Sequence, residues 1–439
     1  MLGDEHRTVG RKREILGRMR EIATLPFSRE GRRRLRIGLR LRAWPLSYPL
    51  AAVYRRILIR RTAVICIIGS FGKTTTTRAV ASVLGRLPPR VGWGFNGRGF
   101  LAEEILRIRP TDSAAAIEVG IRHKGWMRRY ARVLKPSCVV VTSIGTEHHR
   151  HLGPVAEIRA EKAEMLRRLP PTGTAILNGD DPNVRWMACQ TRAAVRTFGF
   201  GTENDIRADN YRSSGLSGGQ FDLHVDGQLR TVRTHLVGRH QIYSLLAAIA
   251  VSQVGQVDLD RSILALEGLL PTRRRLSPLR LESGAGLLMD TYKSVVDTVD
   301  TALDTLEDIP APHKMVVLGE IFEPPGDPQQ VYGCVGRRVA RVADEAIFIG
   351  EEEFWNSFRT GADTEGTTVL SAQGSVRVAA DLVKGMLTPQ SVVLVKGLSS
   401  QGLERIALHL AGEKVGCARV SCRAAGLWEC GTCDLLRRS

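Results

Sequence analysis

The segment 64–77, with the sequence VICIIGSFGKTTTT, constrains the fold of this chain more than any other stretch. Its apolar run at 64–68 ends in a glycine and leads into a helical pattern, which is typical of a buried strand in a parallel sheet. Gly69 and Gly72 allow the backbone to turn sharply and to approach a ligand closely. The N–H groups at the start of the following helix converge on one point and favour an anion. The segment therefore predicts a phosphate-binding loop between a strand and a helix.

The side chains of this loop indicate what kind of phosphate binds. Lys73 supplies a mobile positive charge for outer phosphates, and Thr74 or Thr75 offers a hydroxyl to Mg²⁺. The full P-loop pattern needs a glycine where Ile67 stands, so the loop is a shortened variant. A lysine-bearing turn without function is the alternative, but it does not account for four consecutive threonines at a helix start. The predicted phosphate site consists of Gly69, Ser70, Gly72, Lys73, Thr74 and Thr75.

Two later strands end in polar side chains on the side of the sheet where this loop lies. The apolar segment 114–119 carries Glu118 near its end, where a carboxylate is placed to hold Mg²⁺ directly or through water. A salt bridge to a nearby arginine is the alternative role for Glu118. A second apolar segment, 138–142, precedes a group of histidines that can be metal ligands, catalytic groups or part of a polar loop: His148, His149 and His151.

Strand and helix patterns alternate along most of the chain, as in α/β proteins. The first series ends with short strands at 195–237, interpreted as a small β insertion, and an apolar helix at 241–254. A basic turn follows and the alternation restarts. We predict a central P-loop-type domain with a parallel sheet and a C-terminal Rossmann-like α/β domain. The expected divisions are a basic N-terminal segment, the central domain with the phosphate-binding loop, the C-terminal domain and a cysteine-rich tail, at 1–61, 62–270, 271–412 and 413–439.

The chain carries a formal net charge of +18, and residues 1–61 are crowded with arginine and lysine around a short apolar patch at 43–54. A solvated basic helix that packs on the next domain is one interpretation of this segment. Peripheral contact with an anionic membrane surface is a second, because basic side chains and an interfacial apolar patch act together there. Nucleic-acid binding is a third, but no nucleic-acid motif accompanies the charge, so no nucleic-acid partner is expected.

The N-terminus does not have the pattern of a signal peptide. No apolar run reaches the ~18 residues that are needed to span a bilayer. We therefore expect a cytoplasmic protein, with peripheral contact at the inner face of the membrane as the open alternative.

Four of the eight cysteines gather in the last 23 residues: Cys417, Cys422, Cys430 and Cys433. The last two form a CxxC pair, which suits one edge of a structural Zn²⁺ site in a reducing compartment. The tail contains no histidine, so such a site would consist of thiolates alone. A redox pair and an unstructured tail are the alternatives.

Several motifs, in order along the chain, resemble the Mur ligase family. They are GSFGKTTTT, EVG, TSIGTEHH, AEKAEML, NGDDP and GRHQIYSLLAAIA. Three more resemble the branch that adds D-alanyl-D-alanine to the UDP-muramoyl tripeptide: MDTYK, VLGEIFEP and LVKGLSSQGLE. The resemblance covers roughly residues 62–410. It implies an ADP-forming ligase that joins a carboxylate to an amine through an acyl phosphate, on a cell-wall precursor or a related peptide.

The resemblance also implies roles for individual residues. Lys73 would hold the β and γ phosphates, with Thr74 and Glu118 on one Mg²⁺. His148 and Lys162 would serve a second Mg²⁺, since the family's lysine at this position is usually carbamylated and then offers oxygen ligands. Around them, Asn178 and Asp181 would lie near the nucleotide, Arg275 near the phosphates, and Asp290, Tyr292 and Lys396 would come from the C-terminal domain when it closes.

The departures from the family pattern lie mostly on the side of the amine substrate. Lys293 and Val295 stand where the branch has asparagines, and Ser244 stands where an asparagine is common. The basic segment 1–61 occupies the place where the branch's UDP-binding domain is expected. The two substrates are therefore left open. A ligase that builds an amino-acid polymer such as polyglutamate, and a non-ligating ATP-binding scaffold, are the alternative functions.

Overall fold

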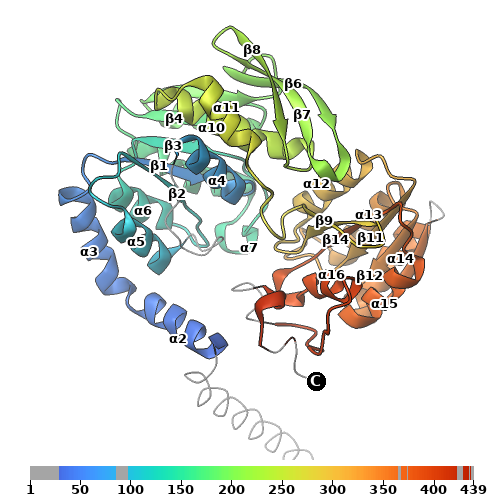
Figure 1. Cartoon of the computed structure of the whole chain (residues 1–439). Coiled ribbons are helices and arrows are strands. Elements are labelled where there is room, and N and C mark those ends of the chain that lie inside the picture. The colour runs from blue at the N-terminus through green and yellow to red at the C-terminus, as the bar shows by residue number, and fades with distance from the viewer. Residues whose placement is uncertain are drawn as a thin grey trace, which may run out of the picture.

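The computed structural model describes residues 29–85, 97–363, 367–372, 374–422, 429–434 and 436. Two α/β units follow each other along the chain, each built on a mainly parallel sheet, and two helices precede them (Figure 1). The first unit contains an 8-stranded sheet and the second a 6-stranded sheet. The α/β class predicted from the alternating patterns is confirmed.

The central sheet has the strand order β2-β1-β3-β4-β5-β6-β7-β8. Pairing is parallel as far as β6, and β7 and β8 are antiparallel additions at one edge. The interpretation of 195–237 as a β insertion is wrong, because these strands belong to the central sheet: β5 pairs in parallel with β4 on one side and with β6 on the other. The strands are β1 (Ala63–Ile68), β2 (Ala114–Glu118), β3 (Cys138–Val141), β4 (Thr174–Asn178), β5 (Ala194–Gly199), β6 (Ile206–Ser213), β7 (Gly219–Val225) and β8 (Gln228–Thr234).

Helices cover both faces of the central sheet, which explains why β1 is apolar along its whole length. Alternate side chains of a strand point to opposite faces, so Val64 and Cys66 lie in one hydrophobic core, and Ile65 and Ile67 lie in the other. The helices are α4 (Lys73–Val83), α5 (Arg98–Arg107), α6 (Trp126–Leu134), α7 (His149–Leu152), α8 (Val155–Ala163), α9 (Pro182–Trp186), α10 (Ile242–Val254) and α11 (Leu259–Glu267). The predicted apolar helix, α10, is buried on nearly all sides.

The second sheet has the order β13-β12-β11-β14-β10-β9, with only β9 antiparallel. Two of its strands, β9 and β13, were not predicted; both are short edge strands without a continuous apolar run. The strands are β9 (Ser277–Arg280), β10 (Gly286–Asp290), β11 (His313–Leu318), β12 (Glu345–Phe348), β13 (Thr368–Ser371) and β14 (Ser391–Lys396). The helices are α12 (Val296–Glu307), α13 (Pro328–Ala340), α14 (Glu352–Asp363), α15 (Val376–Met386) and α16 (Glu404–Leu410).

Two N-terminal helices, α2 (Arg29–Arg42) and α3 (Trp44–Ile57), precede the central sheet. Figure 1 shows α3 along the outer side of the central unit and α2 continuing beyond it. The ring of Trp44 packs against those of Trp126 and Tyr130 on α6. Among the helices that the structure describes, none is both long enough and apolar enough to cross a membrane.

Candidate functional site

The loop between β1 and α4 has a backbone that only glycine allows at two positions. Gly69 has a φ of 140° and Gly72 a φ of 77°. A Cβ atom on Gly69 would lie 2.1 Å from the hydroxyl oxygen of Thr142. The loop is therefore held tightly against the end of β3. Packing as well as the turn requires a glycine at Gly69, whereas at Gly72 the positive φ alone favours glycine.

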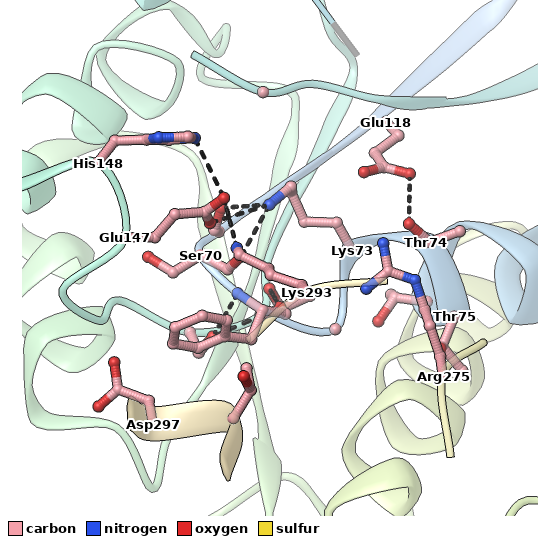
Figure 2. A pocket seen from close by; sticks show the side chains of 18 of the residues that line it. Ser70, Lys73, Thr74, Thr75, Glu118, Glu147, His148, Arg275, Lys293 and Asp297 are labelled. Carbon is pink, nitrogen blue, oxygen red and sulfur yellow. Dashed lines mark hydrogen bonds and ion pairs between the residues drawn. The ribbon is translucent and has the colours of Figure 1, made fainter. Parts of the chain in front are cut away.

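The side chain of Lys73 folds back over this loop. Its Nζ donates hydrogen bonds to the carbonyl oxygens of Gly69 (3.0 Å) and Ser70 (2.9 Å). It also lies 3.8 Å from a carboxylate oxygen of Glu147. The ammonium group is thus fixed at the centre of the loop and points toward the space between the two units (Figure 2).

Glu147 is a central residue of the site that was not singled out from the sequence. It lies among His148 (3.1 Å), Lys73 and, from the second unit, Lys293 (Figure 2). Burial alone would raise the pKa of this carboxyl, but Lys293, Lys73 and the hydrogen bond with His148 bring the pKa well below its usual range. Glu147 is therefore an ionised carboxylate. The sequence feature that could have identified Glu147 is its position directly before His148, after the end of a predicted strand.

Lys162, on α8, also contacts the loop between β1 and α4, through the side chain of Ser70. It is 4% exposed, and its Nζ donates to the hydroxyl oxygen of Ser70 at 2.8 Å. Burial, followed by the nearby charge of Lys73, lowers the pKa of this amine well below its usual range. Lys162 therefore has access to the neutral form, which is the nucleophilic form of an amine.

Thr74 and Glu118 meet at the start of α4. The threonine hydroxyl donates to a carboxylate oxygen of Glu118 at 2.9 Å, so the end of β2 and the first turn of α4 offer oxygen atoms at one point. Hydroxyl and carboxylate oxygens are the donors that Mg²⁺ prefers. This pair fits a hard divalent cation.

The two residues expected near a nucleotide also have structural partners. Asn178 donates to the carbonyl oxygen of Thr142 at 2.9 Å. Asp181 caps α9 and also accepts the N–H of Ile144 at 2.8 Å. The neighbouring Asp180, which was not predicted, accepts a hydrogen bond from the Tyr243 hydroxyl at 2.8 Å.

The second unit supplies the opposite wall of the site. Arg275 lies over the ring of Tyr292, with 4.4 Å between guanidinium carbon and ring centroid, and its side chain points toward Thr74 and Thr75 (Figure 2). Asp297 closes the seam between the units, because its carboxylate accepts a hydrogen bond from the Thr146 hydroxyl at 2.8 Å.

Lys396 is the one predicted residue of this wall that does not face the cavity. It is fully buried, and its ammonium lies 2.9 Å from Asp290. Burial lowers its pKa, although Asp290 opposes the shift. Lys396 therefore positions Asp290 and the backbone at Lys293, to whose carbonyl oxygen it also donates.

The two walls enclose a cavity of about 1170 Å³. Seventeen of the residues singled out from the sequence line it: Gly69, Ser70, Gly72, Lys73, Thr74, Thr75, Glu118, His148, His151, Lys162, Asn178, Asp181, Ser244, Arg275, Asp290, Tyr292 and Lys293. Segments that are far apart in the sequence thus contribute to one site.

Among the described residues, the four tail cysteines are not arranged as ligands of one metal ion, and the zinc interpretation stays a prediction. No group of three or more histidine, cysteine, aspartate or glutamate side chains is arranged to hold a metal in the part of the chain that the structure describes. Burial and the neighbouring Glu404 raise the pKa of the Cys430 thiol, which disfavours the thiolate that zinc needs. Arg405 instead fixes the tail by donating to the carbonyl oxygens of Cys417 and Arg419, at 2.7 Å each.

The site combines a glycine loop, a lysine at a helix start, carboxylates at the ends of parallel strands and a second α/β unit across the cavity. These features are typical of the class of proteins that bind the phosphates of a nucleotide between two α/β units. The family model described as the Mur ligase middle domain matches residues 67–252. The UDP-N-acetylmuramoyl-tripeptide–D-alanyl-D-alanine ligase of Mycobacterium tuberculosis is 28% identical over 386 residues, which cover 82% of this chain and 75% of that protein. The protein of the same name from Bacillus subtilis is 30% identical over 266 residues, covering 60% of this chain and 57% of that protein. The chain is thus similar to Mur ligases over most of its length and contains a Mur ligase middle domain.

Solved structures agree in fold. A MurF protein of Acinetobacter baumannii superimposes with a TM-score of 0.74 at 24% identity, covering 84% of this chain and 81% of that chain. A MurF ligase of Thermotoga maritima in complex with ADP gives a TM-score of 0.73 at 19% identity, covering 84% of each chain. The resemblance inferred from the ordered motifs is confirmed.

Proposed function

We propose that this protein is an ATP-dependent, ADP-forming ligase that joins a carboxylate to an amine, acting on a cell-wall precursor or a related peptide. One observation carries the proposal. Lys73 of the loop and Lys162 of α8 line the same cavity as two residues of the second unit, Arg275 and Asp290. The relatives named above, which are ligases by name, support the same chemistry.

The loop and α4 would hold the nucleotide. Lys73 points into the cavity from a fixed position and would bind the β and γ phosphates. Backbone N–H groups at the start of α4 would bind phosphate oxygens as well, because the N-terminus of a helix favours anions. Asn178 and Asp181 would border the nucleotide on the side of β4, and Arg275 would approach its phosphates from the second unit.

Mg²⁺ fits the oxygen donors of Thr74 and Glu118, with the phosphates and water completing its shell. His148 would serve a second cation, together with Lys162 after carbamylation. When bound, Mg²⁺ neutralises charge on the phosphates that are being transferred. The lowered pKa of Lys162 supports the modification, because a neutral amine reacts with CO₂ and an ammonium group does not.

In the proposed reaction, an oxygen of the substrate carboxylate attacks the γ phosphorus, and ADP leaves. The amine nitrogen then attacks the acyl carbon of the acyl phosphate, inorganic phosphate leaves, and the nitrogen loses a proton. Lys73 and Arg275 would stabilise the negative charge on the phosphate oxygens during both steps. The two walls would keep water from the acyl phosphate, which hydrolyses readily.

The identity of the amine is proposed only as a class. Lys293 lies in the cavity where the D-alanyl-D-alanine-adding branch has asparagine, and it pairs with Glu147. A substrate carboxylate that replaced Glu147 in this pair would be bound by the same cation, which favours an amine substrate that also carries a carboxylate. D-Alanyl-D-alanine and an amino acid such as glutamate both meet this condition. Ligation to an amino-acid polymer is therefore the second candidate. Because the reaction consumes ATP, we propose the cytoplasm as its compartment.

The test measures ADP release with Mg²⁺-ATP and bicarbonate while muropeptide precursors are paired with amino acids or dipeptides. We expect ADP release that requires one carboxylate and one amine, with an amide product of the matching mass. The Lys73→Ala protein is the control for contaminating ATPase. Tight ATP binding without turnover for every pair would contradict the proposal and favour the scaffold.

A further inference from the structure

The helices α2 and α3 carry an exposed apolar stripe outside the cavity. In α3, Leu46, Leu50, Val53 and Ile57 are 79%, 59%, 50% and 64% exposed. They follow one another at intervals of four, three and four residues, so they lie within an arc of about 60° on the helix. Leu35 and Leu39 of α2, one turn apart, are exposed as well.

The opposite face of α3 is anchored, and this fixes the stripe toward solvent. Arg55 is buried and donates to the backbone carbonyl oxygens of Leu134 (2.8 Å) and Lys135 (3.1 Å). The hydroxyl of Tyr48 donates to the carbonyl oxygen of Arg129 at 2.6 Å. With Trp44 packed on α6, the helix cannot rotate its apolar stripe into the protein.

Positive charge surrounds the stripe. Segment 29–61 contains eleven arginines and a single acidic residue, Glu30. Exposed arginines lie at both ends of the stripe: Arg36 and Arg42 on the α2 side, and Arg56, Arg60 and Arg61 at the end of α3. An amphipathic helix with a narrow apolar face and flanking arginines suits the boundary between lipid headgroups and acyl chains.

We propose that α2 and α3 form a docking surface for an anionic lipid bilayer. The stripe would enter the acyl boundary while the arginines contact phosphate headgroups. A second copy of the chain fits less well, because a symmetric contact would bring the two arginine-rich faces together with almost no acidic residue to compensate. Nucleic acid would use the charge but would leave the leucine stripe exposed to water.

This surface is continuous with one end of the cavity. Ile37 of α2 lines the cavity together with Trp126 and Tyr130 of α6. A protein docked through α2 and α3 would therefore hold that end of its cavity close to the headgroups. The inference goes beyond the ligase reaction and does not depend on it.

The experiment is co-sedimentation of the full-length protein with vesicles of phosphatidylglycerol and phosphatidylcholine, or of phosphatidylcholine alone. We expect binding to the anionic vesicles only, weakening as salt is raised. Arg56→Gln with Arg60→Gln should lower the partition coefficient at least tenfold, because each basic residue near such a surface contributes about fivefold. Leu46→Ser with Leu50→Ser should lower it similarly, without any change of charge.

Leu264→Ser is the matched control, because Leu264 is 71% exposed on α11, far from the stripe in sequence. It should bind vesicles like the unmodified protein, and all variants should keep the same melting temperature and nucleotide binding. Equal binding to both kinds of vesicle, or to neither, would overturn the proposal. So would a dimer in solution that the Leu46 and Leu50 changes convert to monomer, or nucleic-acid binding in place of vesicle binding.

Discussion

The two walls of the cavity are built in different ways. The wall from the central unit is held by hydrogen bonds within its own loop, such as those from Lys73 to Gly69 and Ser70. The wall from the second unit meets it through side chains, with Lys293 on Glu147 and Asp297 on Thr146. The first wall departs from the family pattern at Ser244 on α10, and the second departs from it at Lys293. The phosphate-binding loop lies in the first wall alone, so the two walls can be tested separately for the use of ATP and for the choice of substrate.

The largest expected effect tests the wall of the central unit. Lys73→Ala should lower ADP release by about 10³-fold, because it removes a preorganised cation from the charge that develops on the phosphates. The measurement is steady-state ADP release with saturating substrates. Lys124→Ala removes an exposed lysine of the same unit and should leave the rate unchanged; a loss there of similar size would mean that overall charge, not position, is responsible.

Lys162 tests whether this wall needs a modified side chain. Lys162→Ala should lower ADP release by about 10²-fold, and acetate or propionate should restore part of the rate by entering the space that the side chain leaves. Lys162→Gln fills that space with a neutral group, so its rate should not respond to added carboxylates. Failure of every carboxylate to rescue the alanine variant would count against carbamylation.

Lys293 tests the wall of the second unit. Lys293→Asn should lower kcat/KM for the amine substrate by about tenfold while the Kd for ADP stays nearly constant, since losing one cation beside the substrate costs transition-state binding of this order. Lys384→Asn, on an exposed lysine of α15 in the same unit, should change neither quantity. A weaker affinity for ADP with unchanged amine kinetics would assign Lys293 to the nucleotide instead.

The smallest effect concerns the seam between the walls and appears in stability alone. Burial lowers the pKa of His240 from 6.5 to about 4, although Asp290 and Asp304 oppose the shift. In the unfolded chain, the His240 imidazole becomes protonated below pH 6.5. In the folded protein it becomes protonated only near pH 4. The free energy of unfolding should therefore be at its full value above pH 6.5 and fall by about 1–3 kcal/mol as the pH approaches 4.

Urea denaturation at a series of pH values measures this loss. His240→Gln should flatten the decline between pH 6.5 and 4, whereas His235→Gln, on an exposed histidine of the preceding segment, should not. An unchanged slope in the His240 variant would show that other groups cause the acid sensitivity.

The sequence predicted those parts of the molecule that depend on neighbouring residues. The strand predicted at 64–68 is β1, which the structure bounds at Ala63–Ile68, and the loop after β1 follows from glycines, a lysine and threonines within one short segment. The family resemblance added Lys162 and Arg275, which single-sequence reasoning does not connect to the loop. Both line the cavity.

What could not be predicted depends on pairing between distant segments. The ion pair of Glu147 with Lys293 joins two units, and no local pattern indicates which lysine reaches which carboxylate. The continuous sheet from β4 to β8 depends on strand partners rather than on alternation. The burial of Lys396 likewise becomes visible only when β14 is placed at the centre of its sheet.

Glu147 gives the site the character of an ion exchanger. Its carboxylate already compensates the charges of Lys73 and Lys293, so an incoming phosphate replaces one anion with another instead of entering a site of bare positive charge. Such an exchange makes the free energy of phosphate binding less favourable than the two lysines alone would give. It also leaves the displaced Glu147 carboxylate in need of a new counter-ion. Nucleotide affinity should consequently depend on divalent cations more steeply than on monovalent salt.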